Sequence, residues 1–342
     1  MNLRRKGRLT DSILAQIGSC ILSELEQSGS LLGYRSMWHL LRTKYKVCAP
    51  RRVVRELLSV VDPRSVEIRR RGRLHRRIYR SKGPNHCWHI DGNDKLKPFG
   101  FHIHGGIDGY SRKILWLEVA STNKDSFVIG GYYLKAVELC EGCPTLVRAD
   151  MGTENAKVAH LQPFLRRHDT DSFAGCDSFR YGKSVHNQRI EAMWSVLRKW
   201  CLDWWIDFFK RLREEGHYDG SDPIQVDCMT FAFMDLIQSE LDNVVQMWNT
   251  HLIRRSTAET VNGIPNELYH IPEIRGVQDC KHMYDEEDLE LCREYTSDKP
   301  PVRQEFLEVA EILLEENNWS APTDIIYILI FIMQLINGKF KM

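Results

Sequence analysis

The run Trp88-His89-Ile90-Asp91-Gly92 decides the fold of this 342-residue chain, because it alternates like a β-strand and carries a carboxylate. Its aromatic and aliphatic side chains fall on one face of such a strand, and its histidine and aspartate fall on the other. Residues 101–107 and 114–120 are further strand-like runs, separated by a turn. The central part of the chain therefore begins with three consecutive strands.

A second carboxylate, Asp150, follows the short apolar run of residues 145–149. A helical pattern precedes this run, with Ile129, Tyr133 and Val137 on one side. Strand-helix-strand order after an antiparallel meander predicts an α/β fold in which helices flank a mixed sheet. Ligands of such sheets gather at the carboxyl ends of strands, where this run delivers Asp150.

A third carboxylate, Glu191, lies early in the amphipathic stretch of residues 186–209, which predicts one long helix. The apolar stripe of this helix consists of Ile190, Trp194, Leu197, Cys201, Trp204 and Phe208. At about 100° per residue, Glu191 lies beside the stripe, at the edge of the core. Arg198 falls within about 20° of Glu191 on the same helix face.

Carboxylates from three separate elements can hold hard divalent cations, which prefer oxygen ligands. Two such ions can activate a water or a 3′-hydroxyl and stabilise the leaving oxygen of a phosphoryl transfer. We therefore expect Asp91, Asp150 and Glu191 to be the catalytic residues and to bind two Mg²⁺ or Mn²⁺ ions.

Other polar residues compete for a role in the site. Asp108 lies in a turn-like setting that favours a structural role, and Glu154 could support Asp150 from four residues further on. Asp94 is a further rival. Zinc could bind at four nearby histidines, although we expect hydrogen bonds within the sheet to satisfy them: His86, His89, His102 and His104.

The N-terminal part of the chain is strongly basic. Residues 1–82 hold 20 Lys and Arg against 6 Asp and Glu, and residues 83–342 hold 27 against 40, for a net charge of +1. A basic N-terminal segment followed by an acidic remainder indicates that the N-terminal segment binds a polyanion. Residues 9–61 predict three helices, and a tight turn between the last two is typical of a helix-turn-helix. A small helical bundle without a DNA role is the alternative.

Three groups of basic residues are candidates for DNA contacts. The predicted third helix exposes Arg51, Arg52 and Arg55. A basic linker follows, whose side chains would neutralise phosphates without reading bases: Arg69, Arg70, Arg71, Arg73, Arg76 and Arg77. Nuclear import machinery could also recognise this linker, so we expect the protein in the nucleus. Phosphate contacts, with solvated surface positions as the alternative, are expected at Lys183, Arg198 and Lys199.

The carboxylate contexts resemble the retroviral-type integrase and DDE transposase family. The motifs that carry this resemblance are Trp88-x-x-Asp91, Ile107-Asp108-Gly109-Tyr110-Ser111-Arg112, Ala149-Asp150-x-Gly152-Thr153-Glu154-Asn155, Asn187-Gln188-x-x-Glu191, Met247-Trp248-Asn249-Thr250-His251 and Gly263-Ile264-Pro265-Asn266-Glu267-Leu268. More narrowly, the chain is similar to integrase-core proteins of mobile-element origin found in many animal genomes.

This resemblance implies an RNase H-like fold with Asp91, Asp150 and Glu191 as the metal-binding triad. The implied reaction is metal-dependent cleavage at a DNA 3′ end, followed by attack of that 3′-hydroxyl on target DNA. Forty residues separate Asp150 from Glu191, more than in retroviral enzymes, and the zinc module that precedes the retroviral core is missing. The predicted helix-turn-helix would position the DNA instead.

The chain is therefore predicted to have four parts. They are a helix-turn-helix-like domain at residues 1–62, a basic linker at 63–83, a catalytic core at 84–272, and an acidic C-terminal extension with a short apolar tail at 273–342. The partner is expected to be double-stranded DNA. A homo-oligomer is expected by resemblance, because joining two ends needs at least two active sites.

Membrane and zinc-ribbon roles are not expected. The apolar tail at residues 325–336 is too short to cross a bilayer. The ten cysteines are scattered, and a second pair to match Cys140 and Cys143 in a zinc ribbon is missing, which predicts reduced thiols.

Two other functions fit parts of the sequence. A domesticated DNA-binding protein would keep the basic N-terminal segment but would have lost catalysis. An RNase H-like nuclease would cut RNA in hybrids, but a helix-turn-helix docks into the major groove of B-DNA, which disfavours this function.

Overall fold

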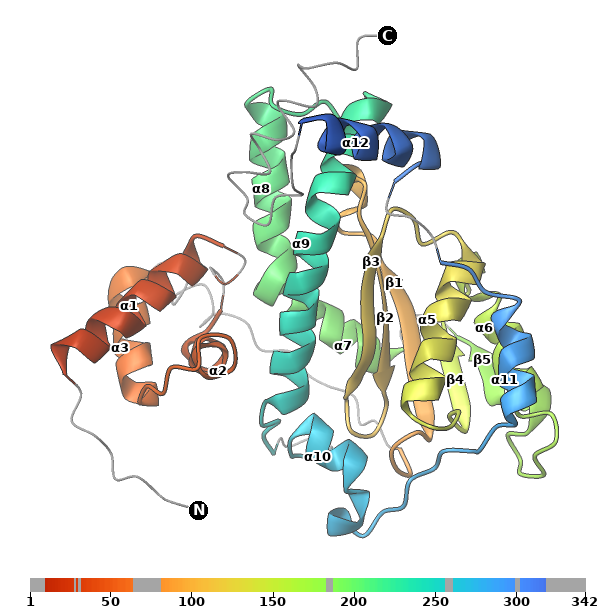
Figure 1. The fold of residues 1–342 in the computed structure, drawn as a ribbon. Helices are drawn as coiled ribbons and strands as arrows, with labels where there is room; N and C mark the ends of the chain where they lie inside the picture. Colours follow the sequence, from red (N-terminus) through yellow and green to blue (C-terminus); the bar gives the residue numbers. More distant parts are fainter. Residues whose placement is uncertain are drawn as a thin grey trace. The chain divides into compact units, whose positions relative to one another are not determined.

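The chain forms two compact units in the computed structural model (Figure 1). One unit consists of Met1–Arg77 and Leu197–Trp205, and the other consists of Ile78–Val196 and Ile206–Met342. The structure describes residues 10–27, 29, 32–63, 81–182, 187–255, 261–298 and 302–317. The linker arginines at 69–77, Lys183 and the apolar tail at 325–336 lie outside the described residues.

The N-terminal unit contains the three predicted helices. They are α1 (Asp11–Leu25), α2 (Tyr34–Thr43) and α3 (Arg51–Val61). Thr10 caps α1 by accepting a hydrogen bond from the amide of Ile13, and Pro50 is the N-cap of α3. The three helices pack on one another through Ile17, Ile21, Met37, Leu41, Val54 and Leu58.

The second unit is built on the mixed sheet that the sequence predicts. Its strands are β1 (Cys87–Asn93), β2 (His102–Asp108), β3 (Ile114–Ala120), β4 (Leu146–Ala149) and β5 (Phe179–Tyr181). They lie in the order β3-β2-β1-β4-β5. β1, β2 and β3 are antiparallel, whereas β4 runs parallel to β1 and to β5. This arrangement confirms the predicted RNase H-like architecture.

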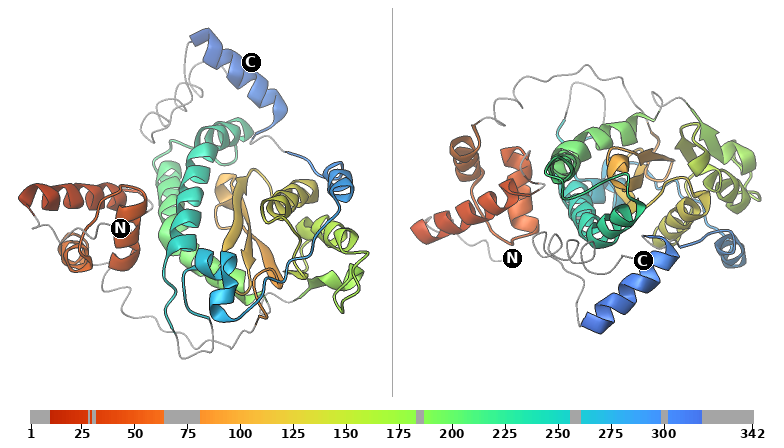
Figure 2. Two further views of the ribbon diagram at one scale, coloured as in Figure 1. Left: turned by 60° about the horizontal axis from the view of Figure 1, so that its bottom comes forward. Right: turned by 90° about the horizontal axis from the view of Figure 1, so that it is seen from above.

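Helices cover both faces of the sheet (Figures 1 and 2). The helices that lie wholly or mostly in this unit are α5 (Ser126–Leu139), α6 (Val158–Leu165), α7 (Gln188–Leu197), α8 (Asp203–Glu214), α9 (Pro223–Thr250), α10 (Pro265–His270), α11 (Glu286–Arg293) and α12 (Gln304–Asn317). α5, α6 and α11 lie on one side, and α7 and α9 lie on the other (Figures 1 and 2).

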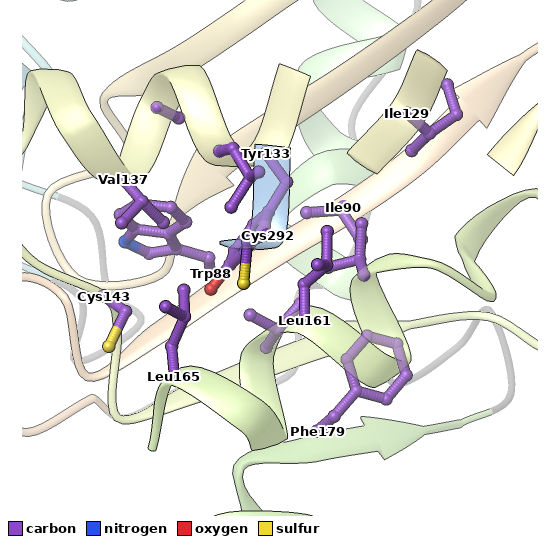
Figure 3. Close-up of a cluster of buried hydrophobic side chains, with 14 of the residues drawn as sticks. Trp88, Ile90, Ile129, Tyr133, Val137, Cys143, Leu161, Leu165, Phe179 and Cys292 are labelled. Atoms are coloured by element: carbon purple, nitrogen blue, oxygen red, sulfur yellow. The ribbon is translucent and has the colours of Figure 1, made fainter. Parts of the chain in front are cut away.

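A large apolar cluster lies between the sheet and the first of these helix layers (Figure 3). Trp88 and Ile90 of β1 enter it, as their alternation with His89 and Asp91 predicts. The predicted face of α5 meets them there: Ile129, Tyr133 and Val137. Because this burial fixes β1, it also fixes the direction in which the polar residues of β1 point.

Side chains of α9 close the exposed edge of the sheet. The amide group of Asn249 accepts from the backbone N–H of Ile114 at 2.8 Å and donates to its carbonyl oxygen at 2.9 Å. Gln238 bonds in the same way with Val119 and Leu117 of β3. These bonds satisfy an edge strand that would otherwise be free to pair with another chain.

The helix predicted as continuous over residues 186–209 is interrupted. A π-helical turn at Arg198–Leu202 separates α7 from α8. A π turn contains one more residue than an α turn, so the apolar stripe shifts by one position beyond it. Trp205 and Phe209 are fully buried. Of the predicted stripe beyond the turn, Phe208 is buried and Trp204 is half-buried.

Residues 273–298 pack within the second unit. His282 forms a β-bridge with Cys143, and α11 inserts Leu289 and Cys292 into the apolar cluster. Arg167 forms an ion pair with Asp288 of α11 at 2.6 Å. The acidic segment is therefore part of this unit, while the predicted boundaries remain predictions.

Two smaller expectations can be compared with the structure. All ten cysteines are free thiols, with Cys140 at the end of α5 and Cys143 buried. In the part of the chain that the structure describes, none of the helices is both long and apolar enough to cross a membrane.

Candidate active site

Asp91 lies inside β1, two residues before the strand ends, and it faces away from the apolar cluster. Trp194 of α7 donates a hydrogen bond from its indole Nε1 to Oδ2 of Asp91 at 2.9 Å. Burial raises the pKa of Asp91 to about 7. The charges of Asp150 and Glu191 add to this rise in pKa, and the Trp194 hydrogen bond opposes it.

Asp150 follows β4 directly, at the carboxyl end of the strand, as predicted. β4 runs parallel to β1, and Arg148 pairs in register with His89. Asp91 and Asp150 each lie two residues beyond this pair, so the register directs both toward the same end of neighbouring strands. Oδ1 of Asp150 accepts a hydrogen bond from the amide of Gly152 at 3.2 Å.

Glu191 lies in the first turn of α7, and its side chain is exposed. The buried side chain of Asn187 attaches this turn to β1: its Nδ2 donates to the carbonyl oxygen of Ile90 at 2.9 Å. Its Oδ1 lies 2.6 Å from Nδ1 of His89, so this imidazole nitrogen carries the proton. Asn187, Glu191 and Trp194 are spaced four and three residues apart, which puts them on one helix face. That face meets β1.

The structure thus brings together the three carboxylates that the sequence predicts, from β1, the end of β4 and α7. Partial desolvation and the charge of Asp150 raise the pKa of Glu191, and Lys95 opposes the rise. Mutual repulsion among three carboxylates is the condition that a divalent cation relieves, and an all-oxygen donor set fits Mg²⁺ or Mn²⁺. The residues present therefore fit the expected metal ions.

Two adjacent glycines make room for tryptophan rings on opposite faces of β2. A Cβ at Gly105 would lie 2.9 Å from Cη2 of Trp194, and a Cβ at Gly106 would collide with the ring of Trp116. Gly105 is also the cross-strand partner of Asp91. Local sequence patterns reveal neither the role of these glycines nor the polar contact of Trp194.

The rival carboxylates have other roles. Asp108 is fully buried and accepts hydrogen bonds from the backbone of Asn85, Tyr110 and Ser111 and from the Ser111 hydroxyl, which agrees with a structural role. Glu154 is half-buried, and desolvation followed by the charge of Asp150 raises its pKa. Glu154 is therefore within electrostatic range of Asp150, one of the three carboxylates.

The histidines of the sheet each have their own partner, as expected. His89 is bonded to Asn187, and His102 lies 3.1 Å from Asp94. His104 accepts from Trp116 Nε1 at 3.1 Å. Burial lowers the pKa of His89 to about 3 and that of His104 to about 4, so both are neutral at pH 7.

Among the described residues, one group brings three potential metal ligands within 4.8 Å of one another, and it does not include Asp91, Asp150 or Glu191. The group consists of Asp169, Asp171 and His282. The fully buried guanidinium of Arg166 bonds both carboxylates and lies 3.2 Å from Nδ1 of His282. Because the buried guanidinium of Arg166 already pairs with both carboxylates, we interpret this group as an ion-pair network.

The basic candidates are only partly within the described residues. Arg51, Arg52 and Arg55 are exposed on α3, with Arg52 paired to Glu56 at 2.7 Å. Lys199 is exposed, and Nε of Arg198 bonds Asp203 at 2.7 Å. Their contacts with DNA stay predictions, as do those of the linker arginines and Lys183.

Comparison with known proteins identifies the central part of the chain. A family model described as an integrase core domain matches residues 78–279. The matched span includes the five strands of the sheet and Asp91, Asp150 and Glu191. The curated proteins searched contain no match to this chain.

Proposed function

Because the chain belongs to the integrase core domain family, we propose that it is a polynucleotidyl transferase that cuts DNA and joins the resulting 3′ end to target DNA. Integrase cores generally act on DNA and use divalent metals. The observation that supports the proposal most is the convergence of Asp91, Asp150 and Glu191 from three elements, with two of these charges raising the pKa of Asp91. Carboxylates that serve only as solvated surface do not converge in this way.

The three carboxylates would be the ligands of two Mg²⁺ or Mn²⁺ ions. When bound, these ions supply activation of the attacking water or 3′-hydroxyl and stabilisation of the leaving oxygen. The sheet holds Asp91 and Asp150 in fixed register, and exposed Glu191 completes the set from the side that DNA can reach. Rigid elements of this kind position catalytic groups more accurately than loops do.

The N-terminal unit would hold double-stranded DNA. In this proposal α3 is the recognition helix, and Arg51, Arg52 and Arg55 contact DNA from its exposed face. A homo-oligomer would supply the second active site that a two-ended reaction needs. Residence in the nucleus is proposed from the basic linker of the sequence alone.

The test is nicking of supercoiled plasmid in Mn²⁺ by the full-length protein. We expect the wild type to nick, and Asp150→Asn and Glu191→Gln to lose nicking while DNA binding, measured by gel shift, survives. Asp235→Asn neutralises an exposed carboxylate of α9 and is the matched control, expected to nick like the wild type. Nicking retained by Asp150→Asn would contradict the proposal. If every variant bound DNA and none nicked it, a domesticated DNA-binding protein would be favoured. If the protein cut RNA in RNA–DNA hybrids in preference to duplex DNA, an RNase H-like nuclease would be favoured.

A further inference from the structure

The indole of Trp194 forms a hydrogen bond with one carboxylate oxygen of Asp91. Its Nε1 donates to Oδ2 at 2.9 Å, and the side chain of Trp194 is only 7% exposed. A donor held by a buried ring cannot exchange freely with water, so the bond constrains the rotation of the carboxylate. An N–H bond to a charged carboxylate is also roughly twice as strong as one between neutral groups.

The sheet is shaped to receive this ring. Gly105 is the cross-strand partner of Asp91, and a Cβ there would lie 2.9 Å from Cη2 of Trp194. The same Cβ would lie 3.3 Å from Leu117 on β3. Any side chain beyond hydrogen at this position would press on the ring, so the glycine allows the indole to lie close to β2, next to the carboxylate.

The helix that supplies Glu191 also supplies this donor. Asn187 and Trp194 are seven residues apart, which leaves them within about 20° of each other on α7. Asn187 bonds β1 at His89 and Ile90, and Trp194 bonds the next residue of the strand, Asp91. Glu191 lies between these two attachments, so they fix the spacing between the first and third carboxylates.

We propose that Trp194 is a positioning residue of the metal site: its indole N–H holds Oδ2 of Asp91 and so orients this carboxylate to bind a divalent cation. The proposal rests on the proposed function only in that Asp91 binds a cation. Hydrogen bonds to the ligands of a metal orient them, and their loss typically weakens metal binding by about 10- to 100-fold.

Binding of Mn²⁺ alone to the full-length protein, measured by calorimetry without DNA, tests this role. Trp194→Phe keeps an aromatic ring over Gly105 but removes the donor, and we expect its Mn²⁺ affinity to fall by about 10-fold or more. Trp116→Phe is the matched control, because Trp116 is a buried ring over Gly106 whose indole donates to His104 on the opposite face. We expect Trp116→Phe to bind Mn²⁺ like the wild type.

A second measurement needs no substitution of Trp194. In protein labelled with ¹⁵N at tryptophan, the indole N–H resonance of Trp194 can be assigned from its proximity to Gly105. We expect addition of Mg²⁺ to shift this resonance and to leave that of Trp116 in place. Asp150→Asn should abolish the shift, since the shift depends on a cation bound by the carboxylates.

The outcomes separate this inference from the proposed function. The inference would be overturned if folded Trp194→Phe bound Mn²⁺ as tightly as the wild type. It would also be overturned if Mg²⁺ did not shift the Trp194 resonance, or if the carboxylates of the wild type bound no divalent cation. Mn²⁺ binding that depends on both Asp150 and Trp194, in a protein that never cuts DNA, would support the inference while removing the proposed DNA-joining function.

Discussion

The side-chain amide of Asn187 donates to the carbonyl oxygen of Ile90 at 2.9 Å, which attaches the start of α7 to the strand position next to Asp91. The same side chain accepts the proton of the buried His89 ring. One residue therefore satisfies two buried polar groups and sets the distance between two elements of the candidate site. Groups of this kind are costly to leave unpaired.

We expect Asn187→Ala to lower the free energy of unfolding by about 1–3 kcal/mol for each buried group left without a partner. Plasmid nicking should fall further than DNA binding, because Glu191 loses an attachment to β1. Urea unfolding and the nicking assay measure the two effects. Gln188→Ala, at the neighbouring half-buried position, is the control and should change both much less. Equal behaviour of the two variants would argue against the attachment.

Gly105→Ala should destabilise the protein, because its new methyl group would press on the buried ring of Trp194. Overpacking of this kind costs about 1–3 kcal/mol. Gly131→Ala is the control: a Cβ there meets only ordinary contacts, 3.7 Å or more away, inside α5. Alanine is favoured over glycine in a helix by up to about 1 kcal/mol, so this control should be neutral or stabilising. Thermal unfolding of the two variants should therefore shift in opposite directions, and a stable Gly105→Ala protein would count against the close packing.

Local sequence patterns account for the parts of the site that depend on one element. Strand alternation predicts the face of β1 that carries Asp91, and the apolar run of β4 predicts where Asp150 lies, because both patterns extend over a few residues. The hydrogen bond between Trp194 and Asp91 joins residues 103 positions apart, and no local pattern reveals it. Local patterns likewise do not predict the π turn or the packing of α11 on the sheet unit, because tertiary packing produces both.

Acid should destabilise the fold through His104. Burial lowers the pKa of His104 from 6.5 to about 4, although Asn155 opposes the shift. Because the folded pKa lies below the unfolded value, the unfolded chain binds the extra proton between these two values. The stability that neutral His104 contributes is therefore fully present above pH 6.5 and is lost as the pH falls toward 4.

Unfolding by urea at several pH values checks this linkage. Relative to His104→Gln, the wild type should lose up to about 1.4 kcal/mol of stability for each pH unit between pH 6.5 and 4. His160→Gln, which changes an exposed histidine of α6, is the control for the substitution itself. A His104→Gln protein with the same pH slope as the wild type would show that His104 does not bear this proton.

The docking of α11 makes a prediction about residues beyond the matched integrase core. Leu289 is fully buried in the cluster around Trp88, whereas Leu291, on the same helix, is 43% exposed. Leu289→Ala should lower the free energy of unfolding by about 2–5 kcal/mol, through lost burial and the cavity it leaves. Leu291→Ala should change it by less than about 0.5 kcal/mol. Urea unfolding of the full-length variants measures the difference. If α11 were only an appended acidic tail, the two variants would be equally stable, and β1 with Asp91 would not depend on it.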